Sequence, residues 1–313
     1  MTQEQEQQTG LLSEQEKNVL WTLLYFDIFH YPLTEKEIGW YSPRALNEQW
    51  QTSLVSLVSG KYIYLLNGFY TLHEDRNLVT RRQAGNLLAT KRMKEAQRFS
   101  SLIAHFPFVR SVMLSGSLSK GYMDEKSDID YFIITAAGRL WIVRTALVLF
   151  RRIFLFNSRK YFCTNYFIDH KNLEIQEKNI FTAVEASTLK PMFGKKYVYS
   201  FQAANRWCSQ FLPNHQPENG LGEERDGVLK KVSEKLLSGK WLDSIDRWLM
   251  KKSIAHWENR YRNLLNDKDF SIAFQSTASA SRSHPEFYQK KVLSLYAQKI
   301  SEFEKKHSLN LQS

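Results

Sequence analysis

The stretch with the most chemical potential is LSGSLSKGYMDEKSDIDYFIIT, residues 114–135. Within it, Asp128 and Asp130 stand two residues apart where an apolar run begins. Side chains i and i+2 of a strand project from the same face, so we expect the two carboxylates to lie close together. Like charges at that separation repel each other unless a cation lies between them. Mg²⁺ fits this role, because it takes oxygen ligands from one or two carboxylates and from substrate phosphates.

The residues that precede the aspartates suit the phosphates of a nucleotide. Gly116 lets the backbone come close to a ligand, and the hydroxyl of Ser117 and the N–H groups of the turn can hold phosphate oxygens. Lys120 can neutralise phosphate charge. Two magnesium ions about 3.5–4 Å apart could then hold the attacking and the leaving oxygen of a phosphoryl displacement. A solvated acidic strand end is the simpler alternative, but it leaves the Gly-Ser pair and the spacing unexplained.

The whole pattern is an apolar residue, Gly-Ser, ten residues and then Asp-apolar-Asp. It resembles the signature of the DNA polymerase β superfamily of nucleotidyltransferases, over about residues 105–175. The resemblance implies a small mixed β-sheet with flanking helices and a nucleoside triphosphate, with ATP expected, bound through Mg²⁺. It also implies transfer of a nucleoside monophosphate to an acceptor hydroxyl with release of pyrophosphate. By this resemblance Gly116 and Ser117 hold the triphosphate, and Asp128 and Asp130 hold the metal ions.

The family pattern has a third carboxylate on a neighbouring strand, which helps to activate the acceptor hydroxyl. The candidate strand is YFCTNYFIDH, residues 161–170. Asn165 lies in the middle of it, where the family would place the acid, and an amide cannot act as a base. Asp169 shares its face by alternation, so we expect Asp169 to be the third catalytic carboxylate. A strand-end or turn aspartate is the alternative interpretation of Asp169.

The acceptor is left open by the sequence: it could be a small molecule, a protein side chain or the end of a nucleic acid. Arg139 and Arg144 flank the start of the helix expected over 140–156, and either could reach a phosphate or the acceptor. We interpret Arg144 as a surface or ion-paired residue. Without a third acid, the chain would instead be a catalytically weak nucleotide-binding regulator or an antitoxin-like partner.

The expected fold is α+β, with five segments along the chain. We expect a disordered tail over 1–10, a winged-helix-like domain over 11–75, a linking helix over 76–104, the nucleotidyltransferase core over 105–176, and a helical C-terminal region over 177–313. The polar run STASASRSHP in that last region is expected to be a mobile loop.

The winged-helix resemblance depends on the order of the elements. Capping boxes at Ser13 and Thr34 predict helices over 13–29 and 35–41, and a third helix is expected over 45–58. Asn67-Gly68 between two β-rich runs predicts a hairpin. DNA binding through the third helix is an alternative function, but ALNEQWQTSLVSLV contains no Lys or Arg to contact phosphates.

The amino-acid composition narrows the class of protein but does not identify a partner. Lys and Arg total 43 against 32 for Asp and Glu, a net charge of +11 that suits a polyanionic partner such as a nucleotide. The two cysteines, Cys163 and Cys208, are too few for a disulfide framework. Three arginines interrupt the most apolar segment, residues 140–156, which is shorter than the ~20 residues of a membrane span. We therefore expect a cytoplasmic protein without membrane attachment.

Overall fold

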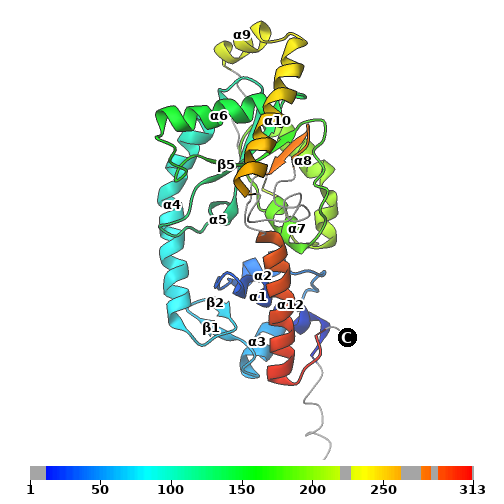
Figure 1. Ribbon diagram of the computed structural model, residues 1–313. Coiled ribbons are helices and arrows are strands. Elements are labelled where there is room, and N and C mark those ends of the chain that lie inside the picture. Colours follow the sequence, from blue (N-terminus) through cyan, green and yellow to red (C-terminus); the bar gives the residue numbers. More distant parts are fainter. Residues whose placement is uncertain (1–11, 219–226, 262–275, 283–287, 312–313) are drawn as a thin grey trace, which may run out of the picture.

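The computed structural model describes residues 12–218, 227–261, 276–282 and 288–311. These residues form a mixture of helices and strands, with one five-stranded mixed sheet and one separate two-stranded hairpin. Figure 1 shows the hairpin and the first helices below the large sheet, with the long helix α4 running along the side of both. The expected disordered tail over 1–10 lies outside the described residues.

The N-terminal unit consists of three helices and the hairpin. Both predicted capping boxes are present: Ser13 exchanges hydrogen bonds with Glu16, and Thr34 with Glu37. Asn67 and Gly68 both have positive φ, 50° and 82°, as a two-residue hairpin turn of the primed type requires. The elements are α1 (Glu14–Asp27), α2 (Glu35–Tyr41), α3 (Gln51–Ser59), β1 (Tyr64–Leu66) and β2 (Phe69–Thr71).

The third helix is shorter than the sequence predicted. It starts at Gln51 instead of near residue 45, and residues 47–50 form a turn. In that turn the side chain of Asn47 accepts a hydrogen bond from the backbone N–H of Gln49. Such local bonds from Asn compete with the helical hydrogen bonds of the backbone, which explains the late start.

Helix α4 (Arg76–Ala104) matches the predicted linking helix and joins the N-terminal unit to the sheet (Figure 1). Its Arg82 is buried rather than part of a solvated basic face. The guanidinium of Arg82 lies 2.6 Å from Glu37 Oε1 and donates to the carbonyl of Pro32 at 2.7 Å. At least one of the basic residues of α4 therefore attaches the helix to the N-terminal unit.

The large sheet has the strand order β6-β3-β4-β5-β7. Its centre is formed by β3 (Val109–Ser115), β4 (Asp130–Thr135) and β5 (Cys163–Asp169). Strands β3 and β4 are antiparallel, whereas β4 and β5 are parallel and are connected by helix α6 (Leu140–Phe154). A parallel pair needs such a crossover, so α6 returns along the sheet from the end of β4 to the start of β5.

Helices cover both faces of this sheet. One face packs against α4, α6 and α10 (Trp241–Tyr261), and the other against α8 (Lys195–Ala204). A separate core joins the N-terminal unit to α7 (Ile180–Ser187) and α12 (Tyr288–His307). The other helices within the described ranges are α5 (Gly116–Ser119), the 3₁₀ turn η1 (Arg206–Gln210) and α9 (Val228–Leu236).

The C-terminal part of the chain departs from the predicted helical region. It contributes both edge strands of the sheet, β6 (Lys190–Phe193) and β7 (Ala280–Arg282), and β7 lies in the run expected to be a mobile loop. These strands have four and three residues, too few for a recognisable alternation. Pairing with β3 and β5 supplies the hydrogen bonds that their own sequences do not predict.

Candidate functional site

The Gly-Ser turn and the acidic strand meet at one edge of the sheet. Ser115, the last residue of β3, pairs in register with Asp130, the first residue of β4. Gly116 follows with φ of +68°, and a Cβ atom added to it would lie 2.7 Å from Asp130 Oδ2. The turn backbone lies directly beside the carboxylate, and both this close approach and the backbone conformation require glycine.

Asp128 lies just before β4, where the backbone already forms hydrogen bonds with the segment that leads into β5. Ile129 is fully buried, its N–H donates to the carbonyl of Lys160, and its own carbonyl accepts from Cys163 N, both at 3.0 Å. Asp128 and Asp130 flank this buried residue, and both are half-buried. The structure thus brings together Gly116 and the two predicted carboxylates.

The pKa of Asp130 is raised from 3.8 to about 7. Burial of the carboxyl group is the main cause, and the negative charges of Asp128 and Glu185 act in the same direction. The thiol of Cys163 and the ammonium group of Lys120 act in the opposite direction. Burial and the neighbouring carboxylates therefore both disfavour the charged form of the Asp130 carboxyl group in the protein alone.

Asn165 occupies the place beside Asp130 where the family pattern has its third acid. Its side-chain Nδ2 donates to Asp130 Oδ1, and its Oδ1 accepts from Cys163 Sγ at 3.0 Å. The register of β4 against β5 shifts between Tyr131 and Phe132, and this irregularity falls opposite Asn165. The amide therefore supports the Asp130 carboxylate through a hydrogen bond and adds no charge.

Asp169 does not join this site, which corrects the expectation from strand alternation. It pairs with Thr135 at the other end of the sheet, six residues along β5 from Cys163, or roughly 20 Å at the usual rise per residue. Its Oδ2 accepts from Gly138 N at 2.9 Å and its Oδ1 from Lys171 N at 2.8 Å. Asp169 is a buried aspartate that stabilises two turns.

Lys120 lies at the site, but its ammonium group already forms an ion pair. Its Nζ lies 2.8 Å from Glu185 Oε1 and donates to the carbonyl of Gly116 at 3.1 Å. The sequence analysis missed Glu185, because helix α7 approaches only through tertiary packing. Tyr31 of the N-terminal unit donates its hydroxyl to the carbonyl of Lys120 at 3.0 Å, so this unit also supports the turn.

The two arginines named from the sequence have different environments. Arg139 pairs with Asp243 of α10. Arg144 is buried, and its guanidinium packs over the rings of Trp141, Phe167 and Trp257. The interpretation of Arg144 as a surface or ion-paired residue is therefore wrong: within the described chain its Nη1 has no hydrogen-bond partner.

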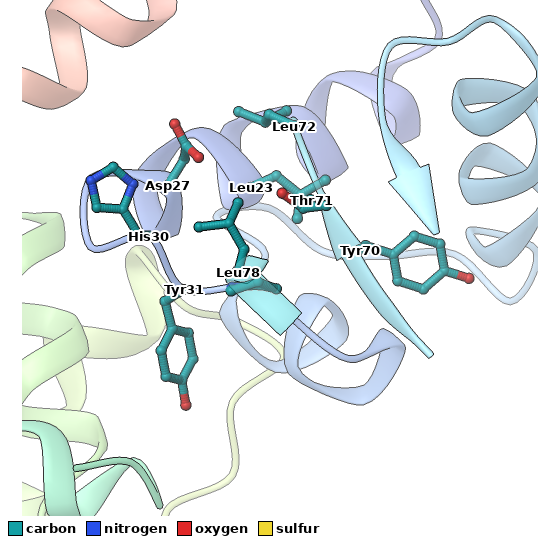
Figure 2. Close-up of a pocket in the computed structure, with 9 residues that line it drawn as sticks. Leu23, Asp27, His30, Tyr31, Tyr70, Thr71, Leu72 and Leu78 are labelled. Carbon is teal, nitrogen blue, oxygen red and sulfur yellow. The ribbon is translucent and has the colours of Figure 1, made fainter. Parts of the chain in front are cut away.

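A pocket in the N-terminal unit lies between α1 and the hairpin (Figure 2). Asp27, His30, Tyr31 and Thr71 are among its lining residues. The space that it encloses is about 10 Å³, which suffices for about one water molecule. This pocket is too small for a nucleotide, and its lining includes none of the residues of the acidic edge.

The donor set at the acidic edge fits a magnesium ion held together with a nucleotide better than a metal site formed by the protein alone. Among the described residues, no group of three or more His, Cys, Asp and Glu side chains could hold a metal ion. Two carboxylates are sufficient for Mg²⁺ when substrate phosphates complete its coordination. Asp128 and Asp130 would be those ligands, and Gly116 has no side chain to crowd Asp130 Oδ2, which an added Cβ would approach to 2.7 Å.

Comparison of the chain with protein-family models, curated proteins and solved structures found no match. Over the residues that the structure describes, no helix is long and apolar enough to cross a membrane. Cys163 and Cys208 are both free and buried. The function must therefore be argued from the geometry of the site.

Proposed function

We propose that this protein is a Mg²⁺-dependent nucleotidyltransferase with a polymerase β-like core and an N-terminal winged-helix-like unit. The observation that carries the proposal is the register of Ser115 with Asp130, which sets a Gly-Ser turn against a pair of carboxylates. The turn would hold the triphosphate through Ser117 and backbone N–H groups. Asp128 and Asp130 would hold Mg²⁺, whose role is to neutralise phosphate charge as the transfer proceeds.

In the proposed reaction, an acceptor hydroxyl oxygen forms a bond to the α-phosphorus of the triphosphate. The bond from that phosphorus to the oxygen bridging to the β-phosphate breaks, and pyrophosphate leaves with the electron pair. The hydroxyl proton passes to water, because the amide of Asn165 cannot accept it. Rate enhancement would come mainly from positioning and charge neutralisation.

Asn165 favours a second candidate function, a nucleotide-binding regulator with little or no turnover. An amide at the place of the third acid supports Asp130 but leaves the acceptor hydroxyl without a base. A DNA-binding role is less well supported, since α3 (QTSLVSLVS) has no basic residue and buries Leu54 and Leu57. The core that the N-terminal unit shares with α7 and α12 supports a packing role for this unit.

The test is to incubate the purified protein with Mg²⁺ and each labelled nucleoside triphosphate, beside an Asp128→Asn/Asp130→Asn double variant. Glu125→Gln, an exposed carboxylate in the same loop, is the matched control. Pyrophosphate release or self-labelling by the native protein and the control alone would support the transferase. Mg²⁺-dependent binding without turnover would favour the regulator. Absence of binding would refute both.

A further inference from the structure

Three arginines lie along α6 and in the segment that follows it. Arg144 and Arg151 are seven residues apart, two helical turns, and therefore share one face of α6. They are only 8% and 9% exposed, whereas Arg159, just before β5, is exposed. Burial and the charges of Arg151 and Arg159 lower the pKa of Arg144 to about 10, so the three positive charges act on one another.

The two buried guanidinium groups lack the negative partners that such groups usually have. Arg144 Nη1 and Arg151 Nε have no hydrogen-bond partner, and neither residue pairs with a carboxylate in the described parts of the chain. The three rings around Arg144, 4.7–5.9 Å from its guanidinium carbon, attract the cation but offer no hydrogen-bond acceptor. A buried charge without a partner is unfavourable, so an anion would stabilise this cluster.

The cluster lies within electrostatic reach of the acidic edge. Burial and Arg159 lower the pKa of Arg151, while Asp128 acts in the opposite direction. Because α6 returns from the end of β4 to the start of β5, its C-terminal half ends near Asp128 and Cys163. The segment with Arg159 lies beside this edge, since the neighbouring Lys160 accepts a hydrogen bond from Ile129 N, whereas Arg144 packs over Phe167 further along β5.

We propose that Arg144, Arg151 and Arg159 bind a phosphate group of the acceptor, so that the acceptor is a small phosphorylated molecule. This inference rests on the proposed nucleotidyltransferase function. Guanidinium groups present paired N–H donors that match phosphate oxygens, and three of them suit its double negative charge. The depth of Arg144 and Arg151 favours a small molecule, because a nucleic acid backbone could contact only the exposed Arg159.

The test uses inorganic phosphate as the probe and measures its binding by calorimetry and thermal unfolding. We expect phosphate to stabilise the native protein and to bind at least tenfold more weakly to Arg151→Met. Arg159→Met, at an exposed position, should weaken binding as well. Arg152→Met, the exposed neighbour on α6, is the matched control and should bind normally. Absence of phosphate binding, or equal binding by all variants, would overturn the proposal.

Two further measurements separate this proposal from the proposed function. Asp128→Asn/Asp130→Asn should keep phosphate binding while losing binding of ATP with Mg²⁺. Arg151→Met should still bind ATP with Mg²⁺. If this variant lost both ATP binding and phosphate binding, the assignment of the arginines to the acceptor would be overturned. Displacement of phosphate by a short single-stranded oligonucleotide would overturn the assignment to a small molecule. Native protein that binds phosphate but no triphosphate would refute the proposed function and leave the anion site standing.

Discussion

Gly116→Ala is the substitution that tests the geometry of the acidic edge most directly. The alanine would keep a φ of +68°, which costs a side-chain-bearing residue about 1–2 kcal/mol. Its Cβ would also lie 2.7 Å from Asp130 Oδ2, about 0.7 Å short of ordinary contact at 3.4 Å. The carboxylate must therefore move or rotate away from the turn, which removes an oxygen from the expected position of Mg²⁺.

Gly121→Ala provides a matched control in the same loop. Gly121 has a nearly identical φ of +72°, but a Cβ added there would have no atom within 4 Å. Urea unfolding should show a backbone cost of about 1–2 kcal/mol in both variants, to which the close contact with Asp130 adds in Gly116→Ala. Only Gly116→Ala should weaken binding of ATP with Mg²⁺, by tenfold or more, which is about 1.4 kcal/mol.

Calorimetric titration of both variants with ATP, in the presence and absence of Mg²⁺, measures this difference. Equal affinities of Gly116→Ala and Gly121→Ala would refute the reasoning, because the contact with Asp130 would then have no consequence for the ligand. A loss of affinity that is the same with and without Mg²⁺ would also refute it, since the displaced group is a metal ligand.

Three other changes test the charges around Asp130. Because the folded state raises the pKa of Asp130 to about 7, it holds a proton that the unfolded chain releases, and stability should fall as the pH rises from about 4 to about 7. Thermal unfolding of Asp130→Asn across this range should lack that fall. Asn165→Asp adds a like charge and removes the hydrogen-bond donor to Asp130, so this variant should unfold at a lower temperature than the native protein without Mg²⁺. Added Mg²⁺ should raise its unfolding temperature more than that of the native protein, and an equal rise in both would contradict the reasoning. Glu185→Gln removes the ion pair of Lys120 and leaves its ammonium group free for phosphate. The variant should bind ATP roughly two- to fivefold more tightly, within the ~1 kcal/mol scale of a part-exposed ion pair. Weaker binding in a titration would count against a role of Lys120 in phosphate binding.

The local features of this fold were predictable from short stretches of sequence. The capping boxes at Ser13 and Thr34 and the Asn67-Gly68 turn satisfy backbone groups within a few residues, so their structural outcome hardly depends on the rest of the chain. The helices α4 and α6 and the central strands were predictable because each is a run long enough to show its pattern in the sequence. The short edge strands β6 and β7 were not, because their hydrogen bonds come from partners distant in sequence.

The residues of the candidate site were also predictable from the sequence only in part. The sequence alone determined that Gly116, Asp128 and Asp130 belong together, since a fixed spacing around one turn and one strand places them at one edge. Only the tertiary structure decided that Asp169 lies at the far end of β5 and that Glu185 reaches Lys120. It also decided that Arg144 and Arg151 are buried without a carboxylate partner among the described residues. Strand alternation predicts the face on which a side chain lies, whereas its neighbours depend on register and on the packing of distant helices.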